Sequence, residues 1–389
     1  MARSPRLLRR TALVGAVLLA AADLAPVHPA ASQTYEPPPW DPPAGHNVTT
    51  VRWGPITIPA ATSSGPGELD NQIATANCRF IPWNCISLPI QKPFSGDGYI
   101  TGILPDLVYA GTDTSVNFDT GGMLHHVVNL NLSDPDVTCA PGFTNLINLV
   151  GLWFGGNERF FAAGNERTIG GISGPGNYGD FVDGDEQWAL IYHLMNFQPE
   201  PIEVEFKYTF SWVRSGPTEV DPVWLDIDQC GDSEVSIPAG YSDRHWRTTA
   251  QQRGTVVGVG GHAHDHSIAV SVENNTKDLN YFTSVAGYAP DSPFAPVGPG
   301  PGTRGHPTAA NEVTSTGHPN APVEAYQGHI SDFTTTTGTP ISLPFDRGDE
   351  IEVHATYNHP TGADDAMGIM IAYVQFEDEQ QCPWWAWWC

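Results

Sequence analysis

Three histidines alternate in the stretch GVGGHAHDHSIAV, residues 258–270: His262, His264 and His266. Alternate side chains leave an extended strand on the same face, so all three would point one way. At a rise of about 3.3 Å per residue, His262 and His264 lie about 6–7 Å apart and can share one ion, whereas His262 and His266, about 13 Å apart, cannot. The stretch therefore predicts a two-histidine metal clamp that needs a further ligand. The alternative is a strand with solvated histidines.

Other histidines and one methionine lie in similar strand-like segments. His125 and His126 are adjacent in GGMLHHVVNL, and because neighbours on a regular strand face opposite ways, a shared ion requires a bulge or a strand end there. His193 lies inside the apolar WALIYHLMNF, where a single histidine can equally be a hydrogen-bonded core residue. Met367 opens the apolar segment MGIMIAYV, which by itself is typical of a core methionine.

The order of these motifs resembles a known family. HHVVNL, YHLMNF, GHAHDHSIAVSV and DDAMGIMIAYV are similar in order, spacing and flanking sequence to motifs of the type II copper, ascorbate-dependent monooxygenases. These are the peptidylglycine α-hydroxylating and dopamine β-monooxygenases. The resemblance extends over roughly residues 100–376.

The resemblance implies two copper ions per chain, each held in its own domain. It assigns His125, His126 and His193 to one ion, and His262, His264 and Met367 to the other. In the family the ion with the methionine ligand binds dioxygen and removes a hydrogen atom from the substrate, the three-histidine ion supplies an electron, and ascorbate re-reduces both. Imidazoles hold both oxidation states of copper and a thioether favours Cu(I), so the ligand types suit these roles. His266 stays outside both sets.

The sequence departs from the family where peptide substrates bind. The family's substrate-binding arginine, two residues before the HxH motif, corresponds to Gly260, and polar residues after the methionine correspond to Ile369 and Ile371. We therefore expect a secreted monooxygenase that hydroxylates a C–H bond of an unknown small organic substrate, with dioxygen and an ascorbate-like reductant. Two alternatives are a copper-binding or storage protein without turnover and a single-metal enzyme that uses only the C-terminal site.

The segments that carry these residues read as β-strands. Runs such as IEVEFKYTFSWV and EIEVHATYN are rich in β-branched and aromatic residues, Gly, Pro, Asn and Asp separate them, and no run has the period of a capped helix. We predict an all-β chain of two tandem jelly-roll-like antiparallel β-sandwich domains, 51–213 and 214–380, with a Pro/Gly loop at 289–320 in the second.

The ends of the chain differ from this pattern. Residues 1–32 have the basic start, the short apolar run and the small-residue end of an export signal, which predicts a secreted protein. Residues 33–50 form a proline-rich leader, and 381–389 a tail with four tryptophans, CPWWAWWC. We expect the tail to fold against the body, because exposing so much apolar surface is costly.

The net charge limits the possible binding partners, and the cysteine content predicts disulfides. The net charge of −26 argues against nucleic acids and anionic membranes, which are polyanions. The oligomeric state is not predicted. Six cysteines in an exported chain favour disulfides. Proximity in sequence favours Cys78–Cys85 and Cys382–Cys389, which leaves Cys139 for Cys230.

Overall fold

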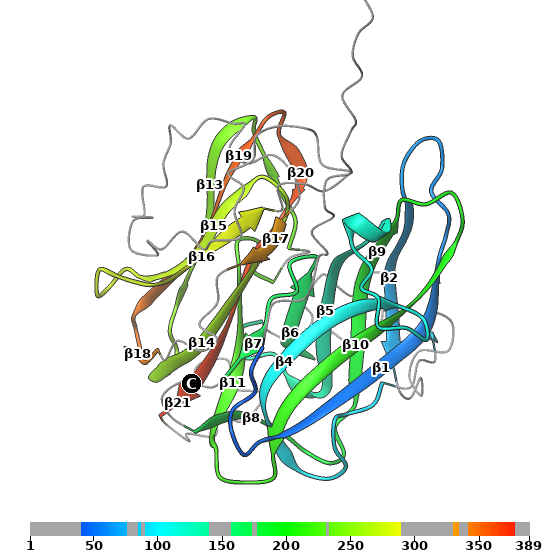
Figure 1. The fold of residues 1–389 in the computed structure, drawn as a ribbon. Coiled ribbons are helices and arrows are strands. Elements are labelled where there is room, and N and C mark those ends of the chain that lie inside the picture. The colour runs from blue at the N-terminus through cyan, green and yellow to red at the C-terminus, as the bar shows by residue number, and fades with distance from the viewer. Residues whose placement is uncertain are drawn as a thin grey trace, which may run out of the picture. The chain divides into compact units, whose positions relative to one another are not determined.

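The computed structural model describes residues 40–75, 85–86, 90–139, 157–172, 177–230, 233–288, 330–333 and 341–377. The predicted export signal (1–32), the loop at 289–320 and the tail at 381–389 lie outside these residues, as do Cys78, Cys382 and Cys389. Apart from the 3-10 turn η1 (Phe118–Thr120), all the regular elements of the described part are strands, which confirms the predicted fold class (Figure 1). No helix in this part is long and apolar enough to cross a membrane.

The first half of the chain forms two facing groups of strands. One group contains β1 (Asn47–Ile58), β10 (Ile202–Val213), β4 (Gly98–Tyr109), β8 (Tyr178–Val182) and the short β7 (Gly170–Gly171). The other is a five-stranded sheet of β3 (Cys85–Ile86), β2 (Gly67–Thr75), β9 (Trp188–Asn196), β5 (Gly122–Pro135) and β6 (Asn157–Gly164). Side chains alternate along β10, where Val204, Phe206 and Phe210 are buried and the intervening positions are more exposed.

The second half repeats this layered arrangement. Its first group contains β11 (Thr218–Asp226), β21 (Gly368–Phe376), β14 (Gly254–Ala263) and β18 (Leu343–Phe345). The second is a five-stranded sheet of β13 (Gly240–Thr249), β19 (Glu350–His359), β15 (Ser267–Asn274), β16 (Leu279–Tyr288) and β17 (Ile330–Phe333). A small ribbon of β12 (Val235–Ile237) and β20 (Ala363–Ala366) completes the described strands.

Two connections join the halves directly. The strands β8 and β11 pair in parallel from Thr218↔Tyr178 to Val220↔Asp180, so one nine-stranded sheet runs through both halves. A disulfide links Cys139, after β5, to Cys230, after β11, as the sequence analysis expected. Parallel pairing needs a long crossover connection, and here that connection contains the whole of β9 and β10.

Three apolar clusters form the core. One lies in the first half and one in the second. The third combines residues of both halves: Val128 and Leu130 of β5, Ala162 of β6, Ala189 and Ile191 of β9, Trp224 of β11, Val257 of β14, and Met367, Ile369, Ile371 and Tyr373 in and beside β21. We call this third group the junction cluster. It holds the β9–β5–β6 surface against the β11–β21–β14 surface.

Buried carboxyl groups lie near the β8–β11 pairing. Burial, followed by neighbouring acidic groups, raises the pKa of Glu158 and Asp180 well above the usual range. For Asp221, on β11, burial and then the charges of Glu219 and Asp134 raise the pKa to about 6. Because the folded state disfavours the ionised form, these groups reduce the free energy of unfolding when they ionise.

We expect Asp221→Asn to stabilise the protein at pH 8 but not at pH 4. The Asp221 carboxyl is protonated in both states below its unfolded pKa, and its ionisation penalty grows as the pH rises from about 4 to about 6. A gain of about 1–2 kcal/mol at pH 8 is expected from a raised pKa of this kind. Thermal unfolding at both pH values measures it, with the exposed Asp278→Asn as control. Equal gains at pH 4 and pH 8 would contradict the assignment.

Candidate metal centre

The His125–His126 pair lies at an irregularity in β5. The pairing of β5 with β9 shifts register between Leu124 and His126, so His125 is an extra residue in the strand. Such a bulge redirects one side chain and lets two neighbours turn toward the same space. The two Nδ1 atoms lie 3.2 Å apart. The bulge that the sequence analysis required for His125 and His126 to share an ion is therefore present.

His193 joins this pair from the neighbouring strand. It is the register partner of His126 in the β5–β9 pairing, so both side chains leave the sheet on one face. The ring centroid of His193 lies 4.5 Å from that of His125 and 5.5 Å from that of His126. Val128 and Ile191 of the junction cluster are also register partners, two residues further along the same face. The three predicted histidines of the first half thus gather beside the junction cluster.

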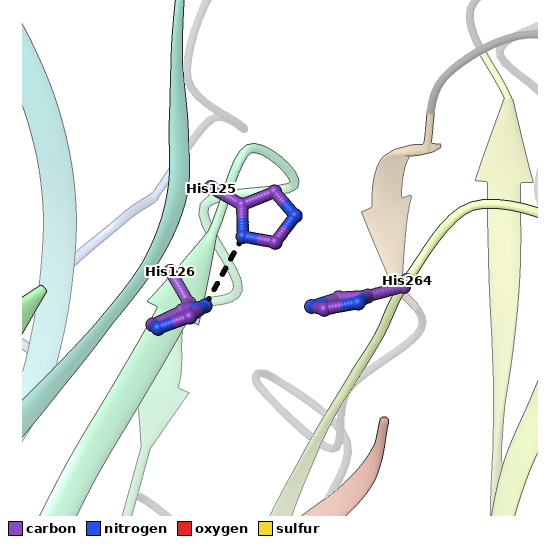
Figure 2. A group of neighbouring side chains, drawn as sticks. All are labelled: His125, His126 and His264. Atoms are coloured by element: carbon purple, nitrogen blue, oxygen red, sulfur yellow. Dashed lines mark hydrogen bonds between the residues drawn. The ribbon is translucent and has the colours of Figure 1, made fainter. Parts of the chain in front are cut away.

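His264 of the second half approaches the same group. Its ring centroid lies 4.4 Å from that of His125, and its plane is within 11° of the His126 plane at 6.3 Å. One nitrogen each of His125, His126 and His264 lies within 4.8 Å of the others. Figure 2 shows His125 and His126 on one strand and His264 on a facing segment, with their rings around a common space. The structure thus brings together histidines that the resemblance assigns to two different ions.

His262 is fixed by a carboxylate that the sequence analysis did not identify. Its Nδ1 lies 2.8 Å from Oε1 of Glu166, and both side chains are buried. Burial raises the pKa of Glu166, but His262 and the Gly164 amide outweigh it and the pKa lies below its usual value. Glu166 is therefore ionised and accepts the hydrogen bond, which places the proton on Nδ1 and leaves the Nε2 lone pair available. A histidine oriented by a carboxylate in this way is typical of metal sites.

Burial disfavours the charged form of three of these histidines. Burial, followed by the other histidines, lowers the pKa of His125 and His126 well below the usual value. Burial and then His262 lower the pKa of His264 to about 4. At neutral pH these imidazoles are uncharged, which is the form that binds a metal ion.

Several buried ring nitrogens of the cluster have no side-chain partner among the described residues. These are Nε2 of His193, Nε2 of His262 and both ring nitrogens of His264, although the His264 ring has a backbone hydrogen bond at Asp365. Buried polar atoms are rarely left unsatisfied, because each costs about 1–3 kcal/mol. Metal–nitrogen bonds of about 2.0–2.1 Å place neighbouring donors about 3.3–3.5 Å apart, close to the 3.2 Å between His125 and His126. The histidine cluster therefore fits a metal ion such as copper or zinc.

Met367 lies beside His264 on the adjacent strand. The β14–β21 register pairs His262 with Ile369 and Ala263 with Gly368, and one further step sets His264 opposite Met367. The Tyr357 hydroxyl accepts a hydrogen bond from the His264 amide at 3.1 Å and donates one to the Met367 carbonyl. The Met367 side chain is 5% exposed and packs in the junction cluster. Met367 thus lies opposite His264 in the strand register, with its side chain packed among apolar residues.

A cavity of about 220 Å³ opens beside the histidines. His125, His262 and His264 form one part of its wall, and Asp265, His266, His359 and Asp365 form another. His126, His193 and Met367 are not among its lining residues. The cavity is smaller than the about 300–1,000 Å³ typical of sites for drug-sized ligands. It admits a small molecule directly to one side of the cluster.

The segment after β6 could not be assigned a role from the sequence alone. Gly164 allows close approach, because a Cβ there would lie 2.7 Å from the His262 ring and 2.6 Å from the Glu166 carboxylate. Arg167, fully buried with φ 47°, binds Asp106 and the Asn165 and Val116 carbonyls. In the sequence, the one feature that marks this segment is the charged pair Glu166-Arg167 between the apolar runs FFAAG and TIGG.

Comparison with known proteins does not identify a family. No protein-family model matches the chain, and no curated protein is significantly similar to it. Similar solved structures include the major capsid protein P2 of bacteriophage PM2, with 9% identity, a TM-score of 0.28, and coverage of 85% of this chain and 99% of that one. PNGF-II has 9% identity, a TM-score of 0.33, and coverage of 85% and 65%. Cowpea mosaic virus empty particles have 8% identity, a TM-score of 0.28, and coverage of 90% and 94%.

We expect Glu166→Gln to weaken metal binding by the histidine cluster about 10–100-fold, the usual loss when a carboxylate behind a metal-binding histidine is replaced. Glutamine keeps the size but no longer fixes the proton on Nδ1 of His262. Competition with a chromophoric Cu(I) chelator measures the affinity.

Glu158→Gln is the matched control for this variant. Glu158 is also buried and lies on β6, but its raised pKa favours the neutral form that glutamine resembles. Equal copper affinities for the two variants would show that Glu166 does not support a metal ligand.

Proposed function

We propose that this protein is a copper-dependent monooxygenase that hydroxylates a C–H bond of a small organic substrate, with dioxygen and an ascorbate-like reductant. The observation that carries the proposal is the meeting of His125, His126, His193, His262 and His264 in one cluster beside a cavity. The family resemblance assigns all five to copper. The ring nitrogens of His193, His262 and His264 that lack a side-chain partner are buried. Buried polar atoms are rarely left unsatisfied, so a bound metal ion explains this arrangement better than chance placement of the histidines.

Copper held by these residues would supply one-electron redox chemistry and the activation of dioxygen. The chain itself has several separate tasks. His125, His126 and His264 present neutral imidazoles, and Glu166 holds the ring of His262 in a single orientation. Tyr357 links the backbones of His264 and Met367, which keeps the two predicted ligands on adjacent strands. The junction cluster packs beside the histidines, because Val128 and Ile191 lie two residues along the same sheet face from His126 and His193.

The cavity limits the substrate to a small molecule that approaches from the side of His125, His262 and His264. Gly260 and Ile369, the counterparts of peptide-binding positions in the family, do not line this cavity. Both lie on the same face of the β14–β21 pair as His262, because Gly260 is the register partner of Ile371 and Ile369 is the register partner of His262. The absence of an arginine at position 260 therefore argues against a substrate with a free carboxylate bound at that point.

The number of ions distinguishes two forms of this proposal. The resemblance implies two ions, whereas the proximity of His264 to His125 and His126 favours one ion shared between the halves. In the two-ion form, His264→Ala removes one copper and leaves the other on His125, His126 and His193. In the shared form, His264→Ala and His125→Ala each remove the single copper. Copper bound per chain after gel filtration separates these outcomes.

We expect His264→Ala to reduce ascorbate-driven oxygen consumption at least 100-fold, because His264 belongs to the ligand set in both forms. His46→Gln is the control, since His46 is half-buried and binds Thr101 and Ser211 away from the cluster. Oxygen uptake with a panel of small organic substrates is the measurement. Tight copper binding with no oxygen uptake on any substrate would favour the copper-binding protein instead.

Met367→Leu tests whether the thioether is a ligand. Leucine has a similar volume, so packing in the junction cluster should lose less than about 1.5 kcal/mol. If sulfur binds copper, oxygen consumption is abolished while the thermal unfolding temperature changes little. Retained oxygen consumption would restrict Met367 to the apolar core and leave the histidines as the complete ligand set.

A further inference from the structure

A second group of possible ligands lies on the outer face of the β13–β19 pair. Asp243 and His245 of β13 are exposed, and His354 of β19 is partly buried. None of the three lines the cavity beside the histidine cluster, and the sequence analysis assigned none of them. We call these residues, with Glu352, the β13–β19 cluster.

The pairing of the two strands sets these side chains together. His245 and His354 are register partners, so both leave the sheet on the same face, and their ring centroids lie 5.4 Å apart. Asp243 lies two residues before His245 and therefore on that face as well. Its Oδ1 lies 3.1 Å from Nδ1 of His354. One donor atom from each of the three residues lies within 4.8 Å of the other two.

These separations suit a metal ion with short bonds. Bonds of about 2.0–2.2 Å to nitrogen and oxygen in a tetrahedral arrangement place donors about 3.3–3.5 Å apart. The distance from His354 to Asp243 is already near this value, and small rotations of the 51% exposed His245 side chain can adjust the third donor. The open side of the cluster leaves a fourth position for water.

Glu352 supports this arrangement from behind. Its Oε1 lies 3.5 Å from Nε2 of His354, the ring nitrogen opposite the one that faces Asp243. Its side chain is 3% exposed, and Asn275 and Arg247 hold the carboxylate in place. A buried carboxylate behind the free nitrogen of a histidine orients the ring and increases its basicity toward a metal.

We propose that the β13–β19 cluster is a second metal site, which binds a divalent transition-metal ion such as Zn²⁺ through His245, Asp243 and Nδ1 of His354. Two imidazoles and one carboxylate select zinc or copper over calcium and magnesium, which prefer oxygen donors. Because β13 is an edge strand of its sheet, the ion joins this edge to β19. The site is independent of the histidine cluster and of the proposed oxidation.

Zinc titration of the metal-free full-length protein tests the site. We expect His245→Gln and His354→Gln each to remove one equivalent of bound Zn²⁺, or to weaken it at least tenfold, relative to wild type. Thr249→Gln, at an exposed position of the same strand, is the matched control and should bind as wild type does. Circular dichroism without metal confirms that all variants fold.

Two further measurements separate this site from the histidine cluster. Zinc should raise the unfolding temperature of wild type by a few degrees more than that of His354→Gln, because only bound metal stabilises the folded state. Glu352→Gln should weaken zinc binding, since it removes the carboxylate that orients the His354 ring. Zinc stoichiometry and affinity that are the same in wild type, His245→Gln and His354→Gln would overturn the proposal, whatever the outcome for copper and oxygen.

Discussion

The packing of one sheet surface against another is the constraint on which the candidate site depends. The junction cluster joins residues of β5, β6 and β9 to residues of β11, β14 and β21, and all of its main members are buried. Three features fix the position of one half against the other. They are the apolar contacts of the junction cluster, the parallel β8–β11 pairing and the Cys139–Cys230 disulfide. The histidines lie at the edge of this packing, so a shift of the two surfaces would separate His264 from His125. Binding at the cluster is therefore coupled to the contact between the halves.

The histidine cluster also has an energetic cost that the packing must support. Burial lowers the pKa of His125, His126 and His264, and several buried ring nitrogens have no side-chain partner among the described residues. Glu166 stabilises only one ring, that of His262. A metal ion would bind the remaining lone pairs and offset the free-energy cost of burying them. Metal binding would therefore increase the free energy of unfolding. The proposed copper chemistry uses a group of residues whose apo form is costly.

Acidic groups behave differently at two places in the structure. Near the β8–β11 pairing, burial and then neighbouring acidic groups raise the pKa values of Glu158, Asp180 and Asp221. On the outer face of β13 and β19, carboxylates are paired with histidine and arginine, and the pKa of Glu352 falls below its usual value although burial acts in the other direction. The first arrangement limits stability at high pH, whereas the second leaves charged donors ready for a cation. The acidic composition of the chain thus has opposite consequences in two places.

The sequence by itself determined the β class, the alternation that sets His262 and His264 on one face, and the requirement for a bulge or a strand end if His125 and His126 share an ion. These features depend on the period of a strand. The Cys139–Cys230 pairing was one of several possible pairings, and the tertiary structure selected it. Only the tertiary structure decided that His264 meets His125, that Glu166 orients His262, and that Met367 packs among apolar residues beside them. Those contacts join residues about 100 or more positions apart, and no local pattern records which strand faces which. They arise from the packing of two apolar surfaces, which many sequences with the same alternation could satisfy in other ways.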